Sequence, residues 1–99
     1  MPSVFRKGDF SVGHDEYPPF EMIEGSENCY CGNQPICRQD IDHFAPHTRR
    51  IPPNDTHARS FVTKGSPNVF LNGYPIAREG DPVSCNDKCG PGCERTFIN

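Results

Sequence analysis

The segment Gly65–Cys85 constrains this chain most, because it specifies a complete hairpin and recurs elsewhere in the sequence. It reads GSPNVFLNGYPIAREGDPVSC. A short apolar run leads to Asn72-Gly73, and a second short run returns from Tyr74. Asn-Gly favours a two-residue type I′ turn, since both of its positions accept positive φ. The segment therefore predicts a β-hairpin followed by a cysteine.

A degenerate copy of this hairpin lies 40 residues earlier, where Gly25–Asp40 reads GSENCYCGNQPICRQD. Half copies stand near both chain ends: residues 92–99 match the opening half and residues 6–9 match the closing half. Self-similarity of this kind indicates a repeat architecture. We therefore expect one domain over residues 1–99 with three pseudo-equivalent units, at about 25–47, 65–85, and 92–99 joined with 6–14.

The composition predicts an all-β fold with a weak core. Hydrophobic residues make up 33% of the 99 residues, and 11 prolines and 9 glycines disfavour long helices. A domain of this size buries little apolar surface, so a disulfide, a metal ion or oligomerisation is needed to stabilise it. We expect short β-hairpins, almost no helix, a long irregular loop over residues 41–60, and a staple built from the six cysteines or four histidines.

A metal site is predicted by the residues that come after the closing turn of each unit. Each unit has one nitrogen or sulfur ligand shortly after its closing turn: His14, His47 and Cys85. They stand five, seven and four residues after Asp9, Asp40 and Asp81. Units packed about a pseudo-three-fold axis would bring these side chains together, and tetrahedral zinc needs a fourth ligand. We predict Cys37 in that place, with His43 and His57 as rivals.

The other cysteines carry less information. Cys29 and Cys31 share one strand face by the period of two, and we interpret them as buried thiols. Cys89 and Cys93 fit a disulfide, a second metal site with Cys29 and Cys31, or neither.

Gly65–Cys85 resembles the proline-alanine-alanine-arginine (PAAR) repeat, with Pro75-Ile76-Ala77-Arg78 in place of the tetrapeptide that names the family. Residues 8–14 are similar to the family's opening segment, and Tyr17-Pro18-Pro19 resembles a proline-rich stretch that comes after it in many phage members. The resemblance implies a small pyramid of short β-strands that caps the trimeric β-helical spike of contractile phage tails and type VI secretion systems. It also implies one structural zinc held by three histidines and one cysteine, whereas Cys37 stands where the family has its fourth ligand, a histidine.

The function predicted from this resemblance is mechanical. We expect a membrane-piercing tip that docks on one trimeric β-helical spike, one chain per trimer, and meets the membrane transiently. A core this small leaves apolar surface for the partner to cover, and the residues expected there are Val69, Phe70, Leu71, Phe97 and Ile98. The start of the chain lacks a signal peptide's apolar stretch, so we expect synthesis in the cytoplasm and assembly on a phage tail or secretion spike.

Other functions fit the sequence less well. A small secreted disulfide-rich binding or inhibitor protein would explain six cysteines but not the repeat. A nucleic-acid module is disfavoured by the net charge of −3. Enzymatic activity is not expected, because four protein ligands leave zinc no open position, and no small-molecule substrate is predicted. Nor do we expect a fused toxin domain within these residues.

Overall fold

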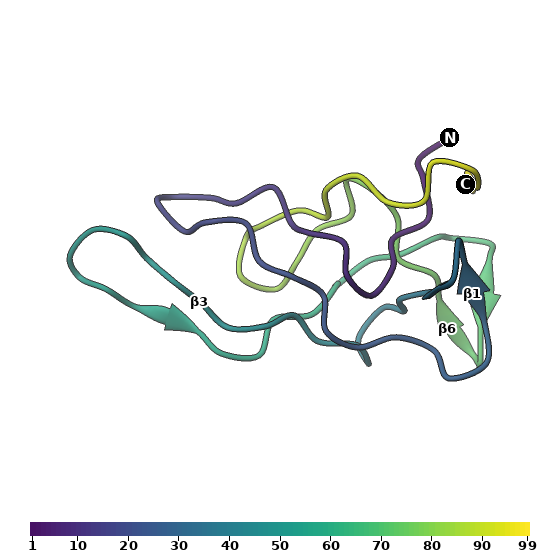
Figure 1. The fold of residues 1–99 in the computed structure, drawn as a ribbon, viewed down its shortest axis with the longest axis horizontal. Helices are drawn as coiled ribbons and strands as arrows, with labels where there is room; N and C mark the ends of the chain where they lie inside the picture. Colours follow the sequence, from purple (N-terminus) through teal and green to yellow (C-terminus); the bar gives the residue numbers. More distant parts are fainter.

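The computed structural model describes residues 1–99 as an all-β fold of short antiparallel hairpins without a helix (Figure 1), which confirms the predicted fold class. No helix is present that is long and apolar enough to span a bilayer. Each of the three two-stranded sheets is one hairpin. The strands are β1 (Tyr30–Cys31), β2 (Gln34–Pro35), β3 (His47–Thr48), β4 (Thr56–His57), β5 (Phe70–Leu71) and β6 (Tyr74–Pro75).

Two of the hairpins have the predicted turns. Asn72 and Gly73 between β5 and β6 have φ of 55° and 84°, and Gly32 and Asn33 between β1 and β2 have φ of 59° and 68°. Positive φ at both central positions gives the type I′ geometry that suits the twist of a tight hairpin. The exchange of Asn and Gly between the two turns is tolerated because both residues accept this conformation.

The two chain ends form a further hairpin that has no connecting turn. Ser3 pairs with Phe97 in an antiparallel bridge, and the Ile98 N–H donates to the Pro2 carbonyl at 3.0 Å. Figure 1 shows the two termini side by side, next to β1 and β6. We call this pair of segments, residues 2–6 and 96–99, the split hairpin.

A closed ring of backbone hydrogen bonds joins the split hairpin, β1–β2 and β5–β6 at the centre of the molecule. The Phe5 N–H donates to the Ala77 carbonyl, Ala77 to Cys37, and Cys37 back to Phe5, each at 3.0 Å. Three residues that donate and accept in a cycle define a pseudo-three-fold axis. We call these hydrogen bonds the axial ring. All three residues are fully buried, so the ring also satisfies backbone groups that water cannot reach.

The ring extends along the axis in a further set of equivalent bonds. The N–H groups of Lys7, Gln39 and Glu79 donate to the carbonyls of Pro35, Pro75 and Ser3 at 2.8–2.9 Å. A proline suits this position because its carbonyl is used and its missing N–H is not needed. In the split hairpin Ser3 stands where the other two hairpins have proline, so Ser3-Val4-Phe5 corresponds to Pro75-Ile76-Ala77.

Each of the three segments leaving the ring turns sharply around an arginine–aspartate pair. In every turn one carboxylate oxygen accepts from the arginine's backbone N–H and Nε–H, and the other accepts from the guanidinium Nη2, all at 2.7–3.1 Å; the pairs are Arg6–Asp9, Arg38–Asp42 and Arg78–Asp81. Bidentate pairs of this geometry fix the backbone as well as the charges. Gly8, Asp40 and Gly80 occupy the positive-φ position of these turns, at 95°, 68° and 87°.

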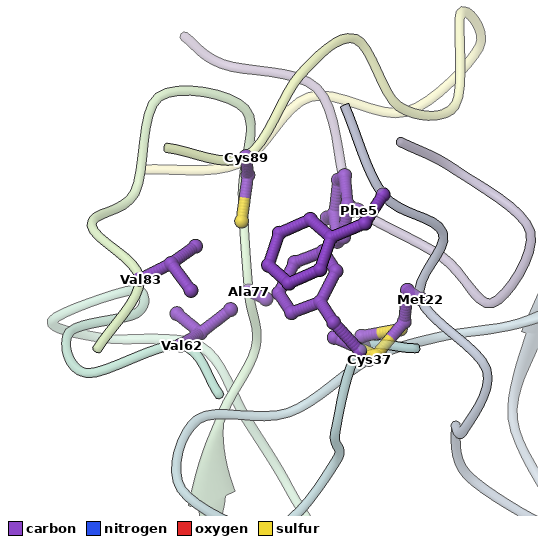
Figure 2. Packing of buried hydrophobic residues seen from close by; sticks show 9 residues of the cluster. Phe5, Met22, Cys37, Val62, Ala77, Val83 and Cys89 are labelled. Atoms are coloured by element: carbon purple, nitrogen blue, oxygen red, sulfur yellow. The ribbon is translucent and has the colours of Figure 1, made fainter. Parts of the chain in front are cut away.

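The larger core cluster packs around the axial ring (Figure 2). Phe5, Cys37 and Ala77 meet there from equivalent positions, and one large side chain with two small ones fills a space that three large ones would overfill. The rest of the cluster comes from the surrounding segments: Phe20, Met22, Phe44, Val62, Val83 and Cys89.

The interpretation of residues 41–60 as a long irregular loop is wrong in one respect. This segment contains the hairpin β3–β4, in which His47 pairs with His57 and Thr48 with Thr56. The hairpin projects from the body of the molecule at the end opposite to β1 and β6 (Figure 1). The molecule is elongated, 39 × 24 × 23 Å. We call the end with β3–β4 the histidine end and the end with β1, β6 and the termini the hairpin end.

We predict that Ala77→Leu lowers the free energy of unfolding by about 1–3 kcal/mol, because added carbon atoms at the axial ring overpack a filled core. Ala58→Leu, at an exposed position, is the matched control and should leave stability nearly unchanged. Urea unfolding followed by circular dichroism measures both. Equal midpoints for the two variants would contradict a tightly filled core at the ring.

Candidate functional site

Four side chains with metal-ligating atoms meet at the histidine end: His14, His47, His57 and Cys85. One ligand atom from each lies within 4.8 Å of all the others. His47 Nε2 is 2.9 Å from His57 Nδ1 and 3.6 Å from Cys85 Sγ. Three imidazoles and one thiol form a ligand set that suits tetrahedral zinc.

The β3–β4 hairpin delivers two of these residues. Directly opposed residues of an antiparallel pair have neighbouring side chains, and His47 lies opposite His57. The next pair is joined by a hydrogen bond of 2.8 Å between the Thr48 and Thr56 hydroxyl groups. The sequence holds a signal for this arrangement, because His-Thr and Thr-His stand in mirrored order on either side of a loop that contains Pro52-Pro53.

His14 is presented by a tight turn with unusual backbone geometry. It pairs with Tyr17, and the two residues between them, Asp15 and Glu16, have φ of 43° and 70°. Such values are uncommon for residues other than glycine and asparagine and are found at functional sites. The Glu16 carbonyl accepts from the Arg50 N–H at 2.9 Å, so the loop of the β3–β4 hairpin supports this turn.

Cys85 lies on a turn that is tied to the His14 turn through Asp87. The Asp87 carboxylate is buried and accepts the backbone N–H of Gly13 at 3.0 Å and of Lys88 at 2.7 Å. Asn86, between Cys85 and Asp87, has φ of 75°. A buried carboxylate that bonds both turns fixes the cysteine relative to the histidine.

Aromatic rings hold the imidazoles in place. The Phe20 ring stacks on His47 with centroids 3.7 Å apart, and the Tyr17 ring stacks on His57 at 4.1 Å. Packing of this kind fixes ring orientation and keeps water from one face of each imidazole.

The surroundings of His47 and His57 in the β3–β4 hairpin favour the neutral form of both imidazoles. Burial lowers the pKa of His47 and of His57, and the neighbouring imidazoles lower the pKa of His57 further. His47 Nδ1 lies 3.0 Å from the Pro18 carbonyl, which can only accept, so this nitrogen carries the proton and Nε2 keeps its lone pair. Neutral imidazoles with a fixed tautomer are the form that binds metals.

One further observation indicates that the site fits a metal ion. His14 Nε2 is buried and has no hydrogen-bond partner. Leaving such a group unpaired costs about 1–3 kcal/mol, and a metal ion at the centre of the four side chains would satisfy it.

The structure separates the predicted ligand Cys37 and the rival His43 from this group. Cys37 lies in the axial ring, and its thiol contacts the Glu24 carbonyl at 3.2 Å. Its position is equivalent to that of Phe5 and Ala77, so its side chain points into the core. His43 Nδ1 pairs with the Glu24 carboxylate at 2.9 Å instead. The other rival, His57, joins the three ligands predicted from the repeat.

The remaining cysteines have separate roles. Cys31 forms a disulfide with Cys93, so the interpretation of Cys31 as a buried thiol is wrong. Cys29 is a half-buried free thiol, and Cys89 is a buried free thiol in the core. A second cluster of metal-ligating side chains, which the sequence left open for these cysteines, is not formed.

The hairpin end carries exposed aromatic side chains at equivalent positions of the three repeated hairpins. Tyr30 and Phe70 are each 56% exposed and Phe97 is 48% exposed. The other residues predicted to bind a partner lie deeper, since Val69, Leu71 and Ile98 pack against the smaller core cluster. Tyr30 is the one aromatic of this set that the predicted surface does not include, although it stands mid-strand in the first copy of the repeat.

We predict that the free thiols differ sharply in reactivity. Burial raises the pKa of the Cys37 and Cys89 thiols well above their usual range, so little reactive thiolate is present. In the metal-free folded protein iodoacetamide should label the half-buried Cys85 much faster than the fully buried Cys37, because the reagent reaches Cys37 only when the core opens. Peptide mass spectrometry measures both rates, and equal rates would place Cys37 outside the core.

Comparisons with known proteins support the resemblance over the second half of the chain. The model of the PAAR motif family matches residues 53–99. Double-stranded DNA deaminase toxin A of Burkholderia cenocepacia (strain H111) is 42% identical over 38 residues. The match covers 38% of this chain and 3% of that protein, so this chain corresponds to a small part of the toxin. Residues 53–99, which include the complete hairpin, His57 and Cys85, therefore form a PAAR motif, as the sequence of Gly65–Cys85 predicted.

Proposed function

We propose that this chain is the structural tip that caps the trimeric β-helical spike of a contractile injection machine. The PAAR motif is typical of spike-tip proteins in these systems. The observation that supports capping most directly is the placement of Tyr30, Phe70 and Phe97, exposed at equivalent positions around a pseudo-three-fold axis.

Symmetry gives the reason for one chain per trimer. We propose that the units at 25–47, 65–85, and 92–99 with 6–14 each face one subunit of the spike. A single chain with an internal pseudo-three-fold axis presents three similar surfaces, which suit a partner that has a true three-fold axis. Exposed apolar side chains at the chain's hairpin end would be covered in this complex, as would strand edges that a β-helix can extend.

We further propose that the histidine end binds one structural zinc ion through His14, His47, His57 and Cys85. The ion would supply no reaction, because four protein ligands fill its coordination sphere. Its effect is to cross-link the His14 turn, the β3–β4 hairpin and the Cys85 turn, which lie far apart in sequence. Binding energy at a site that exists only in the folded state adds directly to folding stability.

The proposed role is mechanical and not enzymatic. The histidine end would lead and meet a membrane transiently while the hairpin end stays on the spike. Deaminase activity belongs to the name of the toxin, and the matched part is too small a share of that protein to carry the activity over. A secreted disulfide-rich protein is a weaker alternative, since one disulfide is formed from six cysteines.

We predict one zinc ion per chain and a loss of it on removal of a ligand. His57→Ala and Cys85→Ser should each weaken zinc binding by more than about 100-fold. Removing a residue that only hydrogen-bonds to a metal ligand already weakens binding by up to about 100-fold, and these two variants remove a ligand itself. His43→Ala and Cys37→Ala are the matched controls, the latter creating the residue found at the equivalent position. Elemental analysis and competition with a zinc chelator measure occupancy and affinity. Zinc loss in Cys37→Ala with retention in His57→Ala would reverse the proposed ligand set.

We predict that the spike binds through the exposed aromatics. Phe70→Asp and Phe97→Asp should each cost at least about 2 kcal/mol of binding free energy, roughly 30-fold in Kd, because a charge would be buried at the interface. Ile51→Asp is the control, since Ile51 is 44% exposed but lies in the loop of the β3–β4 hairpin at the histidine end.

The probe for this experiment is a trimeric β-helical spike protein, with binding measured by calorimetry and the mass of the complex by light scattering. One chain per trimer, with zinc retained in every variant, is the expected result. A stable homotrimer of this chain, or equal binding by all three variants, would contradict the capping model.

A further inference from the structure

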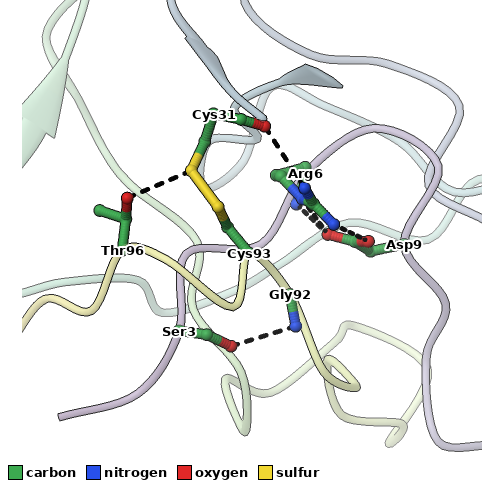
Figure 3. Close-up of a disulfide and its surroundings, with 7 residues drawn as sticks. All are labelled: Ser3, Arg6, Asp9, Cys31, Gly92, Cys93 and Thr96. Carbon is green, nitrogen blue, oxygen red and sulfur yellow. Dashed lines mark hydrogen bonds and ion pairs between the residues drawn. A yellow bond between two sulfur atoms is a disulfide. The ribbon is translucent and has the colours of Figure 1, made fainter. Parts of the chain in front are cut away.

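Three contacts, which we call joints, connect the tip of each repeated hairpin to the opening of the neighbouring unit at the hairpin end. In one joint the Ser26 hydroxyl donates to the Asn72 side-chain oxygen at 3.4 Å. In the second the Ser66 hydroxyl donates to the carbonyl oxygen of Asn99. In the third a disulfide joins Cys31 to Cys93 (Figure 3).

The covalent joint replaces a hydrogen bond that its residues cannot make. Cys93 stands where the other units have Ser26 and Ser66, and the N–H groups of Cys93, Ser26 and Ser66 donate to the equivalent carbonyls of Val4, Ile36 and Ile76. Gly32 stands where the other hairpins have Asn72 and Asn99, so it offers no side-chain acceptor. One disulfide thus takes the place of a serine–asparagine contact.

The disulfide is located where the fold lacks a covalent turn. Residues 96–99 are not connected to the strand they pair with, and they are held to it by two backbone hydrogen bonds, Val4 N–H to Thr96 and Ile98 N–H to Pro2, each at 3.0 Å. The Thr96 hydroxyl also lies 3.3 Å from Cys31 Sγ (Figure 3). The cross-link therefore adds a covalent tie to a segment that no turn connects to its partner strand.

We propose that the Cys31–Cys93 disulfide is a redox-sensitive latch that holds residues 96–99, which we call the C-terminal strand, on the split hairpin. Through this strand it also controls the docking surface, the exposed aromatics Tyr30, Phe70 and Phe97. With the latch closed, the strand holds Phe97 exposed at the position equivalent to those of Tyr30 and Phe70. With it open, the strand frays and the surface loses one of its three aromatics. The docking part rests on the proposed function, whereas the effect on the strand does not.

The exchange reaction is balanced with glutathione disulfide as the oxidant. The two cysteine thiols are oxidised to the disulfide, the S–S bond of glutathione disulfide is broken, and both protons end on the two glutathione thiols formed. The reverse reaction opens the latch. A cleft of about 340 Å³ lies against Cys93, and its charged lining residues are Arg6, Arg95 and Glu94. Two positive charges against one negative charge favour approach of an anionic thiolate such as glutathione.

Hydrogen exchange of single amides tests the latch without any partner. Reduction with a phosphine should speed exchange at Ile98 and Val4 by at least about tenfold, since these amides depend on the C-terminal strand. Ile36 and Ile76 are internal controls, because their N–H groups make the equivalent bonds to Cys29 and Val69 within covalently closed hairpins. Zinc content is measured in parallel to show that Cys85 is unaffected.

Two variants sharpen the test. Cys29→Ser keeps the disulfide and should respond to reduction as the natural chain does. The triple variant Cys31→Leu, Gly32→Asn, Cys93→Ser transplants the joint of Ser26 and Asn72, and should hold the strand with no response to reduction. Gly32 has φ of 59°, which asparagine tolerates. Unchanged exchange at Ile98 and Val4 on reduction of the natural chain would overturn the latch.

A second arm measures binding of the trimeric β-helical spike protein to oxidised and reduced chain. Weaker binding by the reduced form, restored in the triple variant, supports control of docking. Equal binding by both forms would overturn that part of the proposal. If neither form binds while exchange responds to reduction, the proposed capping function fails and the latch on the strand remains.

Discussion

The axial ring of backbone hydrogen bonds is the interaction on which the rest of this structure depends. It joins Phe5, Cys37 and Ala77, three residues far apart in sequence, in a cycle where each N–H and carbonyl is used. Strands of two residues cannot form a sheet with much cooperativity of their own. The ring instead converts three short hairpins into one unit, and the apolar side chains around it need only be numerous enough to exclude water from these bonds.

The repeat in the sequence predicts the hairpins, because turn chemistry is local. Asn72-Gly73 and Gly32-Asn33 require positive φ, and the structure has it at all four residues. Ser3-Val4-Phe5 is not recognisable from the sequence as the third closing strand, since it shares little with Pro75-Ile76-Ala77 beyond an apolar residue in the middle. Its equivalence is visible only in the hydrogen-bonding cycle, which is a property of packing rather than of residue type.

Cys37 and His57 show where reasoning from residue types reaches its limit in the candidate site. Cys37 has a good donor atom, but its direction is set by the axial ring, and the alanine at the equivalent position 77 indicates a core site. His57 is a rival ligand by residue type, yet its position next to His47 depends on the pairing of β3 with β4. An irregular loop over residues 41–60 predicts no such pairing. The mirrored His-Thr and Thr-His pairs indicate which residues lie opposite each other, but only if a hairpin is already expected in this segment.

The number of ligands at the histidine end also depends on symmetry. A tetrahedral ion on a three-fold axis takes three equivalent ligands and a fourth that the symmetry does not repeat. His14, His47 and Cys85 come after the closing turns of the three units, whereas His57 comes from β4, an element without counterparts in the other units. In the proposed zinc site the β3–β4 hairpin therefore supplies a ligand that the repeated units alone do not provide. The fourth ligand is accordingly the one that a repeat-based argument is least able to identify.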